Sequence, residues 1–334
     1  MNPLKRLRAP STVLAALTAL AALAALSACG SSASSAGSAR IVSASASSRP
    51  TGPGTFPVTI AAPGGPVTIS APPTRIVSLS PTATEDLYAD GAGPQVVAVD
   101  QTSDYPAGVP KTTLNGTSPN IEAIAGYDPS LVIAAENEGG LVAGMKKLGV
   151  PVLVEPPAAT LPAAYAEIEQ IGQATGHAAK ADAVVTGMEA QVAADLKKAG
   201  TTHSDLSYFW EVSASPYYSA TSQTIFGEIA GMFGLKNIAD KVATAASGGY
   251  PELTEEYIVS SKPRIIFLTD NDPGDGGQTP AIVAARPGWS GVPAVRNHEI
   301  IALNDDVAAR WGPRLPQLVA AIAAAVESAS KPGS

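Results

Sequence analysis

The chain has 334 residues, of which 45% are hydrophobic and 15% charged, enough for two domains and a sizeable core. The first 28 residues hold three of the 21 Lys and Arg and none of the 29 Asp and Glu, so the remainder has a net charge of −11. This acidic balance excludes nucleic acid as an expected partner, because phosphates need a basic footprint.

The N-terminus has the pattern of an export signal over residues 1–28. Three basic residues precede the apolar run 13–26, which is too short for a comfortable membrane span. The run ends in Leu26-Ser27-Ala28-Cys29, which resembles the lipobox of bacterial lipoproteins, and an ordinary secretory signal is the alternative. Cys29 is the only cysteine, so it forms no internal disulfide. We therefore expect an extracytoplasmic monomer, anchored to the cell membrane through a lipid on Cys29.

The folded part begins after a low-complexity stretch. Residues 29–55 are mostly Ser, Ala, Gly and Pro, which predicts a flexible tether. Residues 56–60 and 66–70 alternate apolar and polar around a Gly-Gly pair, as in a β-hairpin. An N-terminal α/β lobe over residues 56–176 follows from continuous apolar runs that predict buried parallel strands at 76–79, 96–99, 131–134 and 152–154, with a first helix at 82–90.

A second lobe is predicted beyond a long helix. A helix at 161–175 is followed by a connector helix over 177–200, whose apolar residues fall on one face. A C-terminal α/β lobe over residues 201–330 then contains predicted strands at 208–212, 265–268 and 300–303 and helices at 225–233, 254–260, 280–285 and 315–328.

One unit of the sequence occurs in both halves. Asn120-Ile121-Glu122 and Thr254-Glu255-Glu256 each place a helix-capping residue two positions before a Glu, and a Pro follows that Glu by seven. An apolar strand, a helix and a Gly-Val-Pro come next in each half. The repeat predicts an α/β fold of two similar lobes, each with a central, mostly parallel sheet flanked by helices, joined by one long connector helix around a ligand cleft.

The order of motifs resembles the class III periplasmic substrate-binding proteins of ABC importers for cobalamin, ferric siderophores and haem. The resemblance covers residues 56–328, and it rests on Arg75 to Pro81, Thr84-Glu85, Ser103 to Pro106, the two repeat units and Gly312-Pro313-Arg314. It implies two lobes joined by one helix, a ligand between them, and no catalysis. The chain lines up best with the cobalamin-binding member, but it has Gly116 where that member has a Trp before its first docking Glu.

The resemblance implies a docking role for Glu122 and Glu256. In the family, a Glu at the matching position of each lobe pairs with Arg residues of the membrane permease. Two carboxylates on two lobes would give the complex its orientation and association rate. The alternative is that each Glu only complements the dipole of the helix that it begins.

Ligand contacts are expected just after strands, since open α/β sheets bind ligands at the carboxyl ends of their strands. Core packing is the alternative for Trp210 and Tyr218, and a surface position is the alternative for Arg310. The candidates at these positions are Asp104, Tyr105, Trp210, Tyr217, Tyr218, Arg310 and Trp311. Tyr250 is a further candidate, because it immediately precedes the second repeat unit.

The candidate set favours a near-neutral chelate. A triply anionic catecholate complex would need several clustered cations, whereas Arg310 is the one candidate. Cobalamin and ferric hydroxamates are therefore expected as transported ligands, with no resident cofactor or metal. Haem is an alternative through a Tyr ligand, because none of the three His residues follows a strand.

Three other functions are less consistent with the sequence. Bare transition-metal binding needs clustered ligands, and His177, His203 and His298 are scattered. The acidic loop 270–276 resembles a calcium loop, but Ala281 stands where an EF-hand has its twelfth-position Glu. An exported hydrolase would carry a motif such as Gly-x-Ser-x-Gly or His-Glu-x-x-His, and neither is present.

Overall fold

The computed structural model describes residues 55–271 and 277–331, which belong to one compact unit. The export signal, Cys29, the tether up to residue 54 and the centre of the acidic loop lie outside the described residues. The predictions made for those segments are therefore not tested by the structure.

The N-terminal lobe is built on a parallel four-stranded sheet in the order β4-β3-β5-β6. Its strands are short and almost fully buried, as expected where helices cover a parallel sheet. A hairpin of β1 and β2 precedes the sheet, with Val58 paired to Ile69. The strand bounds are β1 Val58–Ala62, β2 Gly65–Ile69, β3 Ile76–Leu79, β4 Val96–Val99, β5 Leu131–Ala134 and β6 Val152–Val154.

The C-terminal lobe has a six-stranded mixed sheet in the order β10-β8-β7-β11-β12, with β9 also paired to β7. The centre of the sheet is parallel, whereas β8 and β10 are antiparallel additions at one edge. The strand bounds are β7 Ser207–Ala214, β8 Tyr217–Ser219, β9 Lys236–Asn237, β10 Glu252–Leu253, β11 Ile265–Leu268 and β12 Ile300–Ala302.

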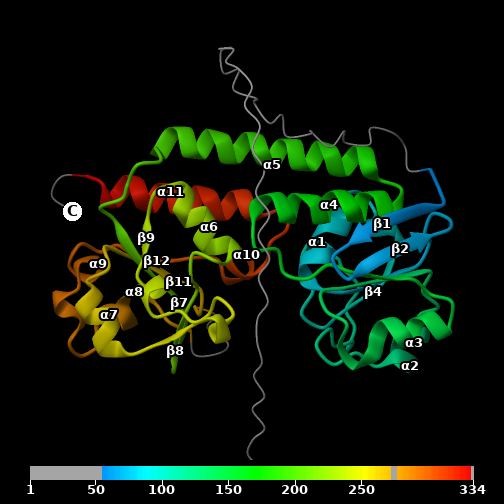
Figure 1. Cartoon of the computed structure of the whole chain (residues 1–334), viewed down its shortest axis with the longest axis horizontal. Coiled ribbons are helices and arrows are strands. Elements are labelled where there is room, and N and C mark those ends of the chain that lie inside the picture. The colour runs from blue at the N-terminus through cyan, green and yellow to red at the C-terminus, as the bar shows by residue number, and fades with distance from the viewer. Residues whose placement is uncertain (1–54, 272–276, 332–334) are drawn as a thin grey trace, which may run out of the picture. The chain divides into compact units, whose positions relative to one another are not determined.

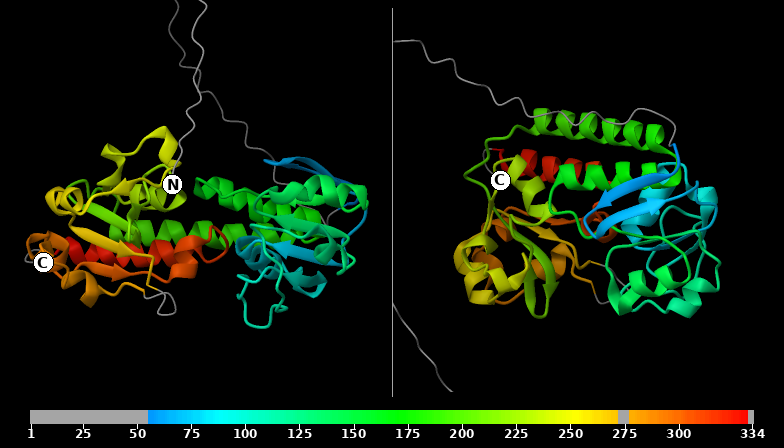
Figure 2. Two further views of the ribbon diagram at one scale, coloured as in Figure 1. Left: turned by 90° about the horizontal axis from the view of Figure 1, so that it is seen from below. Right: turned by 45° about the vertical axis from the view of Figure 1, so that its right-hand side comes forward.

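Three long helices link the two sheets. The 22-residue helix α5 runs beside α4 of the N-terminal lobe and α11 of the C-terminal lobe (Figures 1 and 2). The helix bounds are α1 Pro81–Ala89, α2 Ile121–Ala125, α3 Leu141–Lys147, α4 Leu161–Thr175, α5 Ala178–Ala199, α6 Ile225–Met232, α7 Glu255–Ser261, α8 Pro280–Ala284, α9 Pro293–Arg296, α10 Asp305–Ala309 and α11 Leu315–Ala329. The predicted fold class and its long connector are confirmed.

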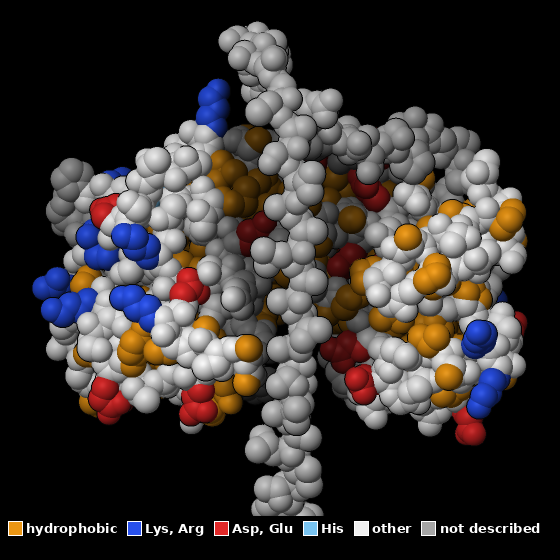
Figure 3. Space-filling model, in the orientation of Figure 1, with side chains coloured by type: hydrophobic (Ala, Val, Ile, Leu, Met, Phe, Trp, Pro, Cys, Tyr) orange, Lys and Arg blue, Asp and Glu red, His pale blue; other side chains and the backbone are white. Residues whose placement is uncertain are grey.

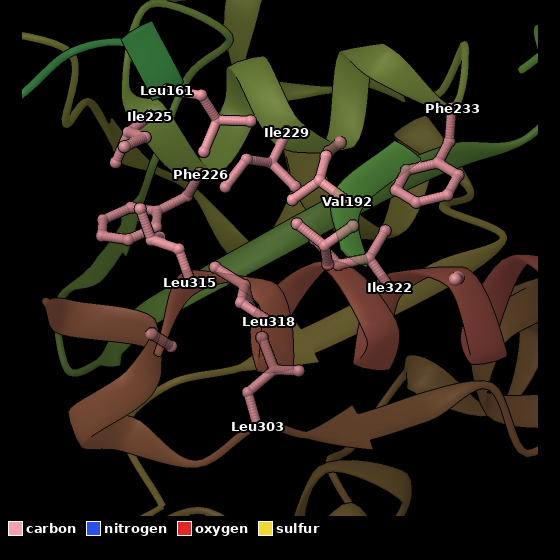
Figure 4. Packing of buried hydrophobic residues seen from close by; sticks show 14 of the residues in the cluster. Leu161, Val192, Ile225, Phe226, Ile229, Phe233, Leu303, Leu315, Leu318 and Ile322 are labelled. Carbon is pink, nitrogen blue, oxygen red and sulfur yellow. The ribbon is translucent and has the colours of Figure 1, made fainter. Parts of the chain in front are cut away.

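The largest apolar core extends from α4 and α5 into the C-terminal lobe. Figure 4 shows Ile229 of α6, Phe233 directly after α6, and Leu318 and Ile322 of α11 around this core. Because α4 supplies Leu161 and Ile168 to the same cluster, the core joins the two lobes instead of stopping at a lobe boundary. This continuity favours a rigid connection, since close-packed interiors resist deformation.

The repeated unit is confirmed in its first part only. Asn120 and Thr254 cap α2 and α7 with their side chains, and each helix leads to a central strand, β5 or β11. After Gly149-Val150-Pro151 the chain enters strand β6, but Pro293 of the second Gly-Val-Pro begins helix α9. The two lobes are therefore related at the capped helix and strand, and they differ beyond that point.

Candidate functional site

The carboxyl ends of the four N-terminal-lobe strands meet at one hollow of about 210 Å³. Such convergence is where open α/β sheets place ligands. Each strand contributes a lining residue at or just beyond its end: Leu79 from β3, Asp100 from β4, Ala135 from β5 and Pro157 beyond β6.

A second hollow of about 250 Å³ adjoins the first, because Pro157, Ala309 and Trp311 line both. Its other wall comes from the C-terminal lobe, where the N-terminus of α6 contributes Ile225 and Phe226 and a loop contributes Tyr250. We call the two adjoining hollows the cleft. Both lobes line it, and Trp311 stands between its two halves.

Gly116 makes a close approach to the wall of the cleft. A Cβ atom at this position would lie 2.3 Å from the carbonyl oxygen of Leu79, at the end of β3. Only glycine permits this approach without a backbone shift. Gly116 is therefore a lining residue with no side chain, and a larger residue would not fit this backbone arrangement.

Arg310 joins the lobes through ion pairs. Its guanidinium donates to Glu85 at 2.9 Å, to Asp104 at 2.9 Å and to Asp306 at 2.6 Å. Glu85 is only 3% exposed and also accepts two hydrogen bonds from Arg314, at 2.6 and 2.7 Å. Charge-assisted pairs of this kind orient both partners. Arg310 is therefore a lining residue whose charge is already neutralised by three carboxylates.

Trp311 is fixed by a second buried acid. Its indole Nε1 donates a 2.7 Å hydrogen bond to Oε2 of Glu167, which lies on α4 and is 6% exposed. Burial raises the pKa of Glu167 to about 7, and the bond from Trp311 acts to lower it. The ring next to the cleft thus depends on a carboxyl group of the other lobe.

Further acids lie behind this contact without cationic partners. Burial raises the pKa of Glu155 to about 8, with a smaller contribution from Glu167. Burial also raises the pKa of Asp86 well above its ordinary value, and the neighbouring carboxyls Asp90, Glu167, Glu85 and Glu155 raise it further. Both pKa values are raised because several uncompensated charges in one buried region are unfavourable.

The structure brings together four of the predicted ligand residues. Asp104 is bonded to Arg310, and Arg310, Trp311 and Tyr250 line the cleft. Tyr105 lies apart from them, in a separate hollow of about 370 Å³ where Arg314 sits 4.2 Å from the centre of its ring. The roles of these residues in binding stay predictions.

Trp210 is a core residue, and its prediction as a ligand contact is wrong. It is 1% exposed, stacks on Phe226 and packs against Phe267, because this position of β7 faces helix α6. Tyr217 lies on β8, which is paired with both β7 and β10, under the guanidinium of Arg286 and against Trp289. Tyr218 is 38% exposed and does not line the cleft as the described residues define it.

The two predicted docking residues occupy equivalent exposed positions. Glu122 and Glu256 lie in the first turns of α2 and α7, and both are exposed. Both helices lie on the side of the described unit opposite α5 (Figure 1), so one partner surface can reach both.

Glu85 and Glu167 were not singled out from the sequence as site residues. A signal for Glu167 existed, because it follows Leu161 and Ala164 at helical spacing and so falls on the buried face of α4. Glu85 occupies the same kind of position on α1, where five neighbouring residues are also buried. A carboxylate on an apolar face needs a partner, and here the partners come from residues 310–314.

Two searches of the described residues gave negative results. In residues 55–271 and 277–331, no group of three or more His, Cys, Asp or Glu side chains could hold a metal ion. Within the same ranges, none of the helices combines the length and the hydrophobicity that a membrane crossing requires.

Comparisons with known proteins agree with this geometry. The family model described as "Periplasmic binding protein" matches residues 76–307. The chain is 34% identical over 280 residues to the uncharacterised ABC transporter substrate-binding lipoprotein YvrC of Bacillus subtilis, covering 81% of this chain and 86% of the relative.

Two solved structures are similar over most of the chain. The vitamin B12-binding protein BtuF of Vibrio cholerae has a TM-score of 0.65 at 26% identity, covering 78% of this chain and 99% of that one. The haem-binding protein RhuT of Roseiflexus has a TM-score of 0.65 at 25% identity, covering 77% of this chain and 99% of that one. The chain belongs to the periplasmic binding proteins, a family of extracytoplasmic substrate-binding components of ABC importers and not of enzymes.

Proposed function

We propose that this periplasmic binding protein captures a large, near-neutral metal chelate, a cobalamin or a ferric hydroxamate siderophore, and delivers it to an ABC permease. The charge of the cleft carries the proposal. Arg310 is the only cation among the described residues that line it, and three carboxylates surround its guanidinium. Asp100 and Glu136 add acidic groups to the same wall. An anionic chelate would meet a negative potential there.

The surface distribution of charge supports this selectivity. On the face seen in Figure 3, Lys and Arg side chains lie toward the outer parts of the two halves, whereas Asp and Glu side chains occur both at the margins and beside the space between the halves. The two hollows together fall within the roughly 300–1,000 Å³ typical of small-molecule sites. The likeness to a vitamin B12-binding structure supports the same class of ligand.

Haem is the second candidate, because one of the similar structures binds haem. A tyrosinate would be its axial ligand here, and Tyr250 is the Tyr that lines the cleft. Burial raises the pKa of Tyr250 above its ordinary value of 10.0, which disfavours the tyrosinate form. The acidic wall also disfavours the two haem propionates, so the geometry supports haem less than a near-neutral chelate.

A titration series tests the ligand class. Purified protein without the first 29 residues is titrated with cyanocobalamin, ferrioxamine B, ferrichrome, haem and a ferric tris-catecholate, with Trp fluorescence as the readout. We expect saturable binding of at least one near-neutral chelate and weaker binding of the two anionic ones. Tightest binding of the tris-catecholate, or binding of zinc with no response to any chelate, would overturn the proposal.

Charge reversal of one residue in the cleft tests whether the acidic wall selects the ligand. Glu136 is exposed and has no role in the core, so Glu136→Lys is expected to leave the fold unchanged. The variant should strengthen binding of the anionic chelates relative to cyanocobalamin. An unchanged ratio would show that the charge of this wall does not select the ligand.

Delivery is proposed to use Glu122 and Glu256. One exposed carboxylate on each lobe forms a two-point contact for basic residues of a permease, which favours correct orientation. The double variant Glu122→Lys/Glu256→Lys should keep its affinity for the chelate and lose uptake in cells. Reversal of Asp182 and Glu189 on α5, at the opposite side, is the control and should leave uptake intact. Uptake retained by the first variant would refute the docking role.

Membrane anchoring is proposed to occur through a lipid on Cys29. The lipobox-like sequence before it and the lipoprotein name of a 34% identical relative support this proposal. Cys29→Ala should move the protein from the membrane fraction to the medium. Retention of the variant in the membrane fraction would exclude this anchor.

A further inference from the structure

Trp311 differs from the other two Trp residues of the chain. Trp210 and Trp289 are 1% and 0% exposed, whereas Trp311 is half-buried and lines both hollows of the cleft. Its ring is therefore the large aromatic surface placed where a ligand that fills both hollows would have to lie. The orientation of this ring decides what area the ligand can contact.

The segment that carries Trp311 is held from the N-terminal lobe on both sides. Glu85 binds Arg310 before it and Arg314 after it, and Glu167 binds the indole itself. Within the same segment, a Cβ atom on Gly312 would lie 3.1 Å from Oδ1 of Asp86, so the backbone rests directly on α1. The backbone is thus fixed by Glu85 and α1, and the rotation of the ring is left to Glu167.

Glu167 is an unfavourable choice for a purely structural position. It faces the apolar side of α4, and its raised pKa reports that burial disfavours its charge. A Met or Leu would fill a similar volume in this helix without that desolvation cost. The hydrogen-bond partner that explains a carboxyl group here is the indole N–H of Trp311.

We propose that Glu167 is a positioning residue of the cleft, which orients the Trp311 ring toward the bound ligand by accepting the hydrogen bond of its indole. This inference rests on the proposed function, because it assigns the ring a share of the ligand's binding surface. Glu167 itself touches no ligand. Its effect passes through Trp311, so a variant that keeps the acceptor should keep the affinity.

The test compares Glu167→Met, which removes the acceptor at nearly constant volume, with Glu167→Gln, which retains one. Acrylamide quenching of Trp fluorescence is measured first, without ligand. Because the other two Trp residues are fully buried, the quenchable part of the signal belongs to Trp311, and Trp311→Phe identifies it. We expect quenching to increase in Glu167→Met and to stay near wild type in Glu167→Gln.

Affinity for cyanocobalamin and ferrioxamine B is measured next on the same variants. Glu167→Met should raise the Kd of the bound chelate about tenfold, which corresponds to about 1.4 kcal/mol. Glu167→Gln should stay within about threefold. Asp90→Asn is the matched control, because it removes a fully buried carboxyl whose oxygens accept no hydrogen bond from a described residue, and it should change neither the quenching nor the Kd. If Glu167→Met does not fold, Glu167→Leu replaces it.

The outcomes separate the two proposals. Quenching that is unchanged in Glu167→Met would overturn the positioning role, whatever the ligand. Increased quenching with an unchanged Kd would show that the ring orientation does not matter for binding, and it would also overturn the role. If the wild type binds none of the chelates, the proposed function fails, and the role in affinity fails with it. Increased quenching together with a raised Kd, rescued by Gln, supports the proposal.

Discussion

The stability of this protein should fall as the pH rises from 5 to 9, and Asp90 should account for much of the loss. Asp90 is 0% exposed, and neither of its carboxylate oxygens has a hydrogen-bond partner among the described residues. Burial raises its pKa from 3.8 to about 8, although Lys180 acts to lower it. The folded state therefore retains a proton that the unfolded state releases near pH 4.

The direction and the size of the change in stability follow from the difference between the two pKa values of Asp90. A group with a raised pKa in the folded state contributes full stability below its unfolded pKa, and this contribution is lost as the pH rises through the folded pKa. One pKa unit corresponds to about 1.4 kcal/mol, so a rise of the pKa from 3.8 to about 8 gives a loss of about 6 kcal/mol between pH 4 and pH 9. Glu155, with its pKa raised to about 8, should act with the same sign.

Urea unfolding at pH 5 and pH 9 measures this loss in the wild type and in Asp90→Asn. The two proteins should differ little at pH 5, where Asp90 is protonated and uncharged. At pH 9 the variant should be the more stable protein by several kcal/mol, because Asn cannot ionise. An identical pH dependence in both proteins, or a wild type whose stability increases with pH, would refute the reasoning.

Three further substitutions test the site and the core. Glu85→Gln should destabilise the protein by about 3–5 kcal/mol in urea unfolding, because two arginines lose their shared buried partner; a loss below 1 kcal/mol would contradict the ion-pair assignment. Trp210→Ala should cost about 3–5 kcal/mol of stability while the folded variant keeps its Kd for the chelate, and a large change in Kd would restore Trp210 as a ligand contact. Gly116→Ala should cost about 1–3 kcal/mol and weaken binding, since its Cβ would overlap the carbonyl of Leu79; a variant with normal stability and affinity would show that the loop moves freely.

The residues of the candidate site that lie just after the ends of strands were predictable from the sequence. The rule that ligands bind at the carboxyl ends of parallel strands identified Asp104, Arg310 and Trp311 near the cleft, and Tyr250 was identified by its place just before the second repeat unit. The same rule failed for Trp210. Successive residues of a strand point to opposite faces of the sheet, and which residues point to which face depends on the register of the strand. An apolar strand with two covered faces shows no alternation of apolar and polar residues, so the sequence does not indicate which face Trp210 points to.

The sequence by itself determined the central strands and the long helices, the division into two α/β halves and the acidic character of the protein, but not the short strands β8, β9 and β10 or the short helix α10. These properties depend on local hydrophobic periodicity, on capping residues such as Asn120 and Thr254, and on composition. Only the tertiary structure decided that Glu85 and Glu167 hold the segment that carries Arg310 and Trp311. These partners are separated by more than 140 positions along the chain, and no local pattern encodes which buried acid receives which donor once the lobes pack together.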